Sequence, residues 1–86
     1  MSDCMAIGFV MIKVETSLEK EVLKKLEKIE EISEVHPLFG DYDFIAKIEA
    51  ENFDQLGDVI IKKIRTIKGV VDTKTLVGIK IGTKKM

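Results

Sequence analysis

The feature that most constrains the fold of this chain is a repeat of its own sequence. Lys-Val-Glu at positions 13–15 recurs as Lys-Ile-Glu at 47–49, and Lys-Ile at 28–29 recurs at 63–64, an offset of about 34 or 35 residues. This offset is the length of a β-α-β unit. Helical repeats have a similar period, but runs of branched and aromatic residues such as 6–14 are typical of strands. The chain is therefore predicted to consist of two β-α-β halves.

The hydrophobic pattern places the elements of each half. Strands are predicted over residues 6–14, 35–39, 42–50 and 70–81. One helix is predicted to start at Thr16, which has the capping-box spacing with Glu19, and the other at Asn52, a favoured N-cap residue. Gly69 follows the last apolar residue of the second helical pattern, where a left-handed backbone favours glycine. Pro37 cannot donate to a strand ladder, which indicates an edge strand.

The order β-α-β-β-α-β predicts an α+β fold of the ferredoxin-like type. In this fold a four-stranded antiparallel sheet carries both helices on one face. The length of 86 residues suits one core, so residues 1–86 are predicted to form a single domain. A basic tail at 83–86 carries no signal for structure.

Charge and cysteine content exclude several classes of protein. Fourteen Lys and Arg residues against fifteen Asp and Glu residues give a net charge of -1, whereas autonomous nucleic-acid binding needs a basic excess. The single cysteine, Cys4, excludes an internal disulfide and a cysteine-rich zinc site, and we assign it no role. The apolar run at 4–12 is too short for a membrane helix. We expect a soluble, cytoplasmic protein that binds neither a membrane nor DNA directly.

Both faces of the first predicted strand are apolar. Val10, Ile12 and Val14 alternate with a second apolar set, Ile7, Phe9 and Met11. Two helices cover one face of such a sheet, and an exposed apolar face is rare in monomers. A second copy packed sheet against sheet would bury it, so the sequence predicts a homodimer. The alternative is a monomer whose outer face is diluted by charged and hydroxyl side chains.

The densest polar cluster is the run Gly40, Asp41, Tyr42 and Asp43. Glycine followed by aspartate is common in hairpin turns, so a turn alone would explain part of the pattern. A glycine turn also offers free N–H groups to a carboxylate, while Asp41 or Asp43 can receive an ammonium group. That pairing suits an amino acid zwitterion.

The remaining polar residues give weaker signals. Thr73 and Thr75 fall on one face of the last predicted strand, where their hydroxyls would suit a small polar pocket. His36, the only histidine, has no second ligand at metal-binding spacing, and we interpret it as a solvated strand residue. No nucleophile has a nearby base and no phosphate-binding loop is present, so we predict no catalytic residue, no metal and no cofactor.

The cluster at 40–43, followed by Phe-Ile-Ala-Lys-Ile at 44–48, resembles the Gly-x-Tyr-Asp turn and third strand of the Lrp/AsnC ligand-binding domain. The run at 64–70 is similar to the closing helix and turn of that family, and Thr73-x-Thr75 is similar to the threonines that follow it. The resemblance extends over nearly the whole chain, from the first strand to the end of the fourth.

The resemblance implies a dimeric α+β barrel whose dimers join into larger rings, typically octamers. It also implies a free amino acid effector bound between dimers, at Gly40, Asp41, Tyr42 and Asp43 and at Thr73 and Thr75. Family regulators carry an N-terminal helix-turn-helix, whereas here the first strand is predicted within a few residues of Met1. We therefore expect a stand-alone sensory domain that regulates transcription through oligomerisation or through a full-length Lrp/AsnC-type regulator.

Two other families share this order of elements. ACT domains also sense amino acids, usually as part of an enzyme. Small dimeric α+β barrel monooxygenases and isomerases are catalysts, and this alternative would need acid–base groups such as His36 and Asp72 in the barrel interior. RNA-recognition domains carry aromatic stacking residues on their central strands, and the sequence has no such signature.

Overall fold

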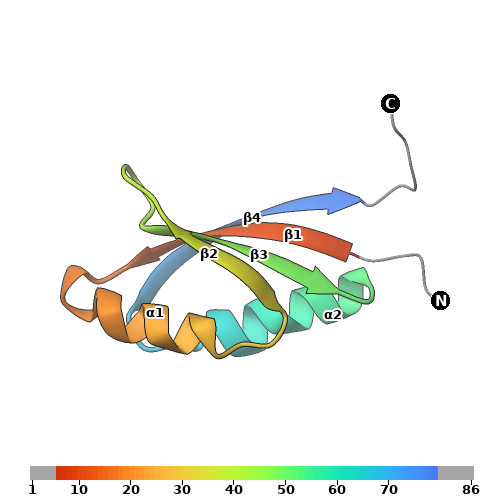
Figure 1. Ribbon diagram of the computed structural model, residues 1–86, viewed down its shortest axis with the longest axis horizontal. Helices are drawn as coiled ribbons and strands as arrows, with labels where there is room; N and C mark the ends of the chain where they lie inside the picture. Colours follow the sequence, from red (N-terminus) through yellow and green to blue (C-terminus); the bar gives the residue numbers. More distant parts are fainter. Residues whose placement is uncertain (1–5, 80–86) are drawn as a thin grey trace.

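The computed structural model describes residues 6–79, which form one antiparallel sheet covered on one side by helices (Figure 1). The strands are β1 (Ala6–Val14), β2 (Ile32–Pro37), β3 (Phe44–Ala50) and β4 (Val70–Ile79). A 3-10 turn, η1 (Thr16–Leu18), precedes helix α1 (Glu19–Glu27), and α2 (Phe53–Asp58) continues into a π-helical segment, η2 (Val59–Ile64). The strand order β2-β3-β1-β4, with both helices on the same face, confirms the predicted ferredoxin-like fold.

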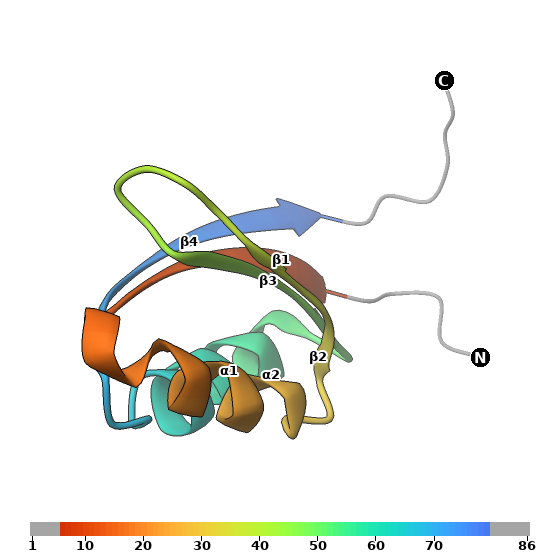
Figure 2. The ribbon, with the colours of Figure 1, turned by 60° about the vertical axis from the view of Figure 1, so that its left-hand side comes forward.

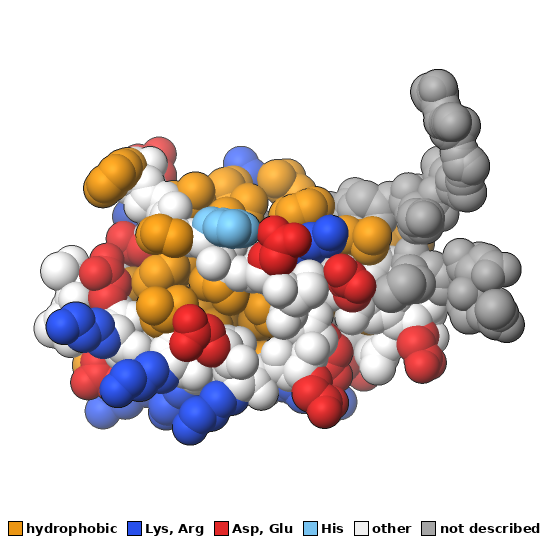
Figure 3. Space-filling view, viewed as in Figure 1, with side chains coloured by type: hydrophobic (Ala, Val, Ile, Leu, Met, Phe, Trp, Pro, Cys, Tyr) orange, Lys and Arg blue, Asp and Glu red, His pale blue; other side chains and the backbone are white. Residues whose placement is uncertain are grey.

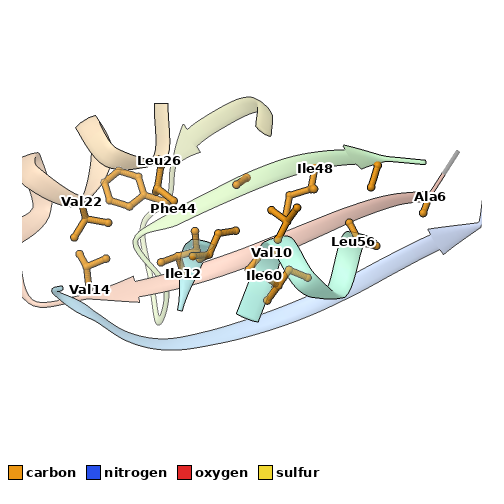
Figure 4. Packing of buried hydrophobic residues seen from close by; sticks show 14 residues of the cluster. Ala6, Val10, Ile12, Val14, Val22, Leu26, Phe44, Ile48, Leu56 and Ile60 are labelled. Carbon is orange, nitrogen blue, oxygen red and sulfur yellow. The ribbon is translucent and has the colours of Figure 1, made fainter. Parts of the chain in front are cut away.

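The core lies between the sheet and the helices. On β1, every second residue from Ala6 to Val14 is buried, and these side chains meet residues of both helices (Figure 4). Val22 and Leu26 of α1 and Leu56 of α2 are almost fully enclosed. The intervening β1 residues face away from the helices, so the predicted alternation is confirmed.

The two strands around the 40–43 cluster are shifted relative to the prediction. β2 starts three residues earlier than predicted and ends at Pro37, and β3 starts at Phe44 rather than at Tyr42. The reason is that residues 38–43 form a loop instead of extending both strands to a two-residue turn. β2 lies at the edge of the sheet, which confirms the position inferred from Pro37.

The start of the first helix differs from the capping-box prediction. Thr16 begins a 3-10 turn, no side chain caps this turn, and the α-helix starts only at Glu19. Backbone groups hold the entry instead, because Leu18 N–H donates to the Glu15 carbonyl at 2.8 Å. The second N-cap is confirmed, since Asn52 accepts a hydrogen bond from Gln55 N–H at 2.8 Å.

The second helix changes its winding midway. In η2 the N–H of Arg65 donates to the carbonyl of Ile60 at 2.9 Å, a spacing of five residues. This wider turn buries Val59 together with Ile60 and Ile64, whereas Phe53 at the helix start is 49% exposed. Phe53 therefore lies outside the core.

Some predicted features fall outside the described residues. They are Cys4, the last two residues of the predicted fourth strand and the basic tail at 83–86. Within residues 6–79, none of the helices is long and apolar enough to cross a membrane.

Candidate functional site

The loop that joins β2 to β3 rises from the sheet on the side away from the helices (Figure 2). Leu38 N–H donates to the carbonyl of Asp43 at 2.8 Å and closes the loop at its base. Gly40 has a φ of 127°, a left-handed conformation that side chains rarely adopt. We call residues 38–43 the β2–β3 loop.

Three further hydrogen bonds fasten this loop to the end of β1. Asp43 N–H donates to the carbonyl of Ile12 at 2.8 Å, and the Asp43 carboxylate accepts from Val14 N–H at 2.9 Å. Lys13 Nζ donates to the carbonyl of Asp41 at 3.3 Å. The loop is thus a fixed structure, and Lys13 adds a positive charge that the sequence analysis did not assign to the site.

The groups that the loop offers to a ligand lie at its tip. Asp41 is exposed, and among residues 6–79 its carboxylate takes part in no ion pair. The N–H groups of Gly40 and Asp41 donate no hydrogen bond within the described chain. Tyr42 and Asp43 are half-buried. A free carboxylate and free amides therefore lie on adjacent residues.

Phe39 stands beside these groups with its side chain 106% exposed. The sequence does not mark Phe39 as a surface residue, because an apolar residue after Val35 and Pro37 fits the end of a strand. Its position directly before Gly40 was the available signal, since residues that flank a glycine turn often leave the strand. Phe39 gives the loop an aromatic surface next to its polar tip.

Thr73 and Thr75 lie elsewhere in the chain. They pair with Ile12 and Val10, whose side chains face the helices, so both threonines are on the helix side of β4. The β2–β3 loop rises on the opposite side (Figure 2). A single copy of the chain therefore does not bring the threonines and the loop together.

Thr73 lines a small hollow of about 130 Å³ between the end of η2 and the start of β4. Arg65, Asp72, Val70 and Val71 form the rest of its lining. The Asp72 carboxylate accepts a hydrogen bond from Thr73 N–H at 2.9 Å. Arg65 could not be identified from the sequence, because no residue near position 65 indicates that Arg65 lies beside residues 70–73.

His36 is exposed on β2, which confirms its interpretation as a solvated strand residue. Its Nε2 lies 3.0 Å from Glu34 Oε1, and this hydrogen bond is the main cause of a lowered pKa of Glu34. The single histidine is visible at the surface in Figure 3, next to an acidic side chain. No group of three or more His, Cys, Asp or Glu side chains within residues 6–79 is placed to hold a metal ion.

The sheet face opposite the helices carries an apolar surface, which we call the outer face. Strand pairing places five apolar residues on it: Ile7, Phe9, Met11, Ile45 and Leu76. Phe9 is 38% exposed and Leu76 is 49% exposed. Lys47, Glu49 and Lys74 pair with members of this set and surround it with charge. Within the described chain no element covers this face (Figure 2).

Comparison with known proteins gives consistent matches over this fold. The model of the Lrp/AsnC ligand binding domain matches residues 7–82. The HTH-type transcriptional regulator FL11 of Pyrococcus furiosus is 36% identical over 75 residues, which are 87% of this chain and 49% of FL11.

Two solved structures share the fold at similar levels of identity. The structure of AsnC from E. coli matches with a TM-score of 0.82 at 27% identity, over 94% of this chain and 55% of AsnC. FFRP-DM1 matches with a TM-score of 0.81 at 29% identity, over 85% of this chain and 97% of its own. The chain spans about half the length of the curated relatives it matches.

Proposed function

Because the chain belongs to the Lrp/AsnC ligand-binding domain family, we propose that it senses a free amino acid at the β2–β3 loop. The observation that carries this proposal is the pairing of the exposed Asp41 carboxylate with unused N–H groups at Gly40 and Asp41. An α-ammonium group would meet the carboxylate and an α-carboxylate would meet the amides. Lys13 Nζ, already at the loop, would strengthen attraction for the α-carboxylate.

Assembly completes the proposed site. We propose that two copies pack through the outer face, sheet against sheet. This packing would bury Phe9 and Leu76 and so remove exposed apolar area from water. Dimers would then join into larger rings, of up to eight chains, and bring Thr73 or Thr75 of one copy toward the loop of another. This proposal accounts for the separation of the threonines from the loop within one chain.

The relatives are named as transcriptional regulators of the helix-turn-helix type, and this chain matches about half of their length. In residues 6–79 the two helices are separated by two strands, so the described domain contains no helix-turn-helix. We propose that it acts on transcription through a partner regulator of the same family, without contacting DNA itself. The location we propose is the cytoplasm, where such a regulator and free amino acids are available.

The enzyme alternative has little support in the site. His36 has Glu34 as its hydrogen-bond partner, is exposed and lies on an edge strand. Asp72 lies on β4, at the opposite edge of the sheet from β2, so the two proposed acid–base groups are not adjacent. The relatives are named as regulators, which also favours a sensory domain over a catalyst.

A thermal-shift screen against the standard free amino acids tests the proposed function. A ligand at a hundred times its dissociation constant stabilises the fold by about 2.7 kcal/mol, which raises the unfolding midpoint by roughly 10 °C or more. Asp41→Asn should weaken binding by roughly tenfold, because the ammonium group loses its charged partner. Glu27→Gln, which removes another exposed carboxylate on α1, is the matched control and should leave affinity unchanged. The absence of any shift with all of these amino acids would overturn the proposal.

A further inference from the structure

We infer that Asp43 is a positioning residue, whose carboxylate holds the β2–β3 loop on β1, and that Asp41 alone is left to bind the effector's ammonium group. The sequence treats the two aspartates as equivalent candidates, because both lie beside the glycine turn. The structure gives them different surroundings. The assignment of Asp41 rests on the function proposed above, whereas the role of Asp43 as a brace can be tested without any effector.

The main-chain N–H and carbonyl of Asp43 and its carboxylate all make hydrogen bonds within the chain. Its N–H donates to Ile12 and its carbonyl accepts from Leu38, each at 2.8 Å. Its Oδ2 accepts from Val14 N–H at 2.9 Å in a half-buried position. A ligand ammonium group would have to share a carboxylate that already holds the backbone in place.

The sheet pairing explains why Val14 needs this partner. The ladder between β1 and β3 ends at the pair Ile12–Phe44, and the chain turns away at residue 43. Within a strand, the N–H of residue 14 points to the same side as the carbonyl of residue 12, so it faces the place where β3 has ended. The Asp43 carboxylate occupies the position of the missing carbonyl. Without it a backbone donor on a buried residue would lack a partner, which is costly.

Asp41 differs from Asp43 in each of these respects. Its side chain is exposed, and within residues 6–79 no hydrogen bond or ion pair uses its carboxylate. Only its main-chain carbonyl is held, by Lys13 Nζ. The loop therefore separates two tasks between two aspartates: Asp43 fixes the loop to β1, and Asp41 presents a free charge.

The hydrogen bond between Val14 N–H and the Asp43 carboxylate also connects the loop to the start of β4. Val14 lies at the point where the register between β1 and β4 shifts, and it pairs there with Val70. The next residue, Glu15, donates its N–H to the carbonyl of Gly69 at 2.8 Å. Loss of the Asp43 bond should therefore loosen the end of β1 as well as the loop.

Substitution of Asp43 by asparagine and by alanine distinguishes two roles of its carboxylate: holding the loop on β1, and binding a charged group of the ligand. In Asp43→Asn the side-chain carbonyl can still accept from Val14 N–H, but the negative charge is gone. In Asp43→Ala both are lost. We expect Asp43→Ala to lower the unfolding midpoint and to speed hydrogen exchange of the Val14 amide by roughly tenfold or more, and Asp43→Asn to stay close to wild type in both.

Effector affinity is then measured by calorimetry, with the amino acid that gives the largest thermal shift on the wild-type chain as the probe. We expect Asp43→Asn to bind within about threefold of wild type, and Asp41→Asn to bind roughly tenfold more weakly at an unchanged unfolding midpoint. If Asp43→Asn weakens binding as much as Asp41→Asn while its midpoint is unchanged, Asp43 contacts the effector and the inference is wrong.

The exchange measurement also stands by itself. If Asp43→Ala neither lowers the unfolding midpoint nor speeds exchange of the Val14 amide, the Asp43 carboxylate does not hold the loop on β1. This conclusion does not depend on what binds to the loop. If instead no amino acid binds the wild-type chain but the exchange effect is present, the proposed function fails and the brace is supported. The two failures are therefore distinguishable.

Discussion

Gly69 and Val22 are in such close contact that a Cβ atom added to Gly69 would lie 2.8 Å from Val22 Cγ2. Gly69 also has a φ of 106°, where an L side chain is strained. Its carbonyl accepts the hydrogen bond from Glu15 N–H described above. Space and backbone conformation thus both require glycine at the point where the second helix returns to β4.

Replacement of this glycine should be the most damaging single-methyl change in the fold. Gly69→Ala adds the strain of a positive φ to a clash with Val22 and Leu18, which together should cost about 2–4 kcal/mol. The unfolding midpoint should fall by roughly 10 °C or more. Gly57→Ala is the matched control, because a Cβ at Gly57 has nothing within 4 Å. That control should stabilise α2 by about 0.5–1 kcal/mol, and equal effects of the two changes would contradict this account.

The ion pair between Lys63 and Glu31 predicts a dependence of stability on pH. Lys63 Nζ lies 3.0 Å from Glu31 Oε1 and joins η2 to the segment before β2. The hydrogen bond from Lys63 is the main cause of the lowered pKa of Glu31, whose ordinary value is 4.5. A carboxylate with a lowered pKa in the folded state stabilises the fold above its ordinary pKa, and this contribution is lost as the pH falls through the lowered value.

Lys63→Met should therefore lower the free energy of unfolding at pH 7 by about 0.5 kcal/mol, the size expected for a partly exposed pair. The difference from wild type should disappear in acid, below the lowered pKa. Lys62→Met is the control, since its pairing with Asp58 is longer, at 4.0 Å, and both side chains are more exposed. Denaturant unfolding at several pH values measures both differences, and a Lys63→Met effect that persists in acid would show that packing, not the ion pair, is responsible.

Elements that depend on local patterns could be predicted from the sequence. β1 has the predicted bounds because residues 6–14 form a continuous run rich in branched and aromatic side chains. Asn52 caps α2 and Gly69 adopts a positive φ because both preferences arise from the residue itself and its nearest neighbours. The offset between the two halves, together with the branched and aromatic runs typical of strands, identifies the fold.

Features that depend on contacts between distant residues could not be predicted. The bond between Asp43 and Val14 joins residues 29 positions apart, so no local pattern distinguishes Asp43 from Asp41. The alternation placed Thr73 and Thr75 on one face, but only the pairing with β1 shows which face that is. The π-helical turn in η2 has no signal in the sequence, because the apolar residues of this segment also fit the spacing of an ordinary α-helix.

The charge of the domain leads to a prediction for DNA. The net charge of -1 and the lack of a helix-turn-helix in residues 6–79 remove the two usual sources of duplex binding. The 86-residue chain should not shift a DNA duplex in a gel at micromolar protein, even at low salt. A shift at physiological salt that weakens as salt is raised would show that the domain binds DNA directly.

The outer face gives a prediction for assembly. If two copies pack through this face, Phe9→Glu or Leu76→Glu should place a charge in an apolar interface and convert the assembly to smaller species. Ile61→Glu is the matched control, because Ile61 is 57% exposed but lies on η2, on the helix side of the molecule. The wild type and Ile61→Glu should give the same mass by light scattering, that of a dimer or a multiple of it, and the outer-face variants should dissociate upon dilution. Circular dichroism would verify that each variant remains folded. A wild-type chain that is already monomeric at micromolar concentration would refute packing through the outer face.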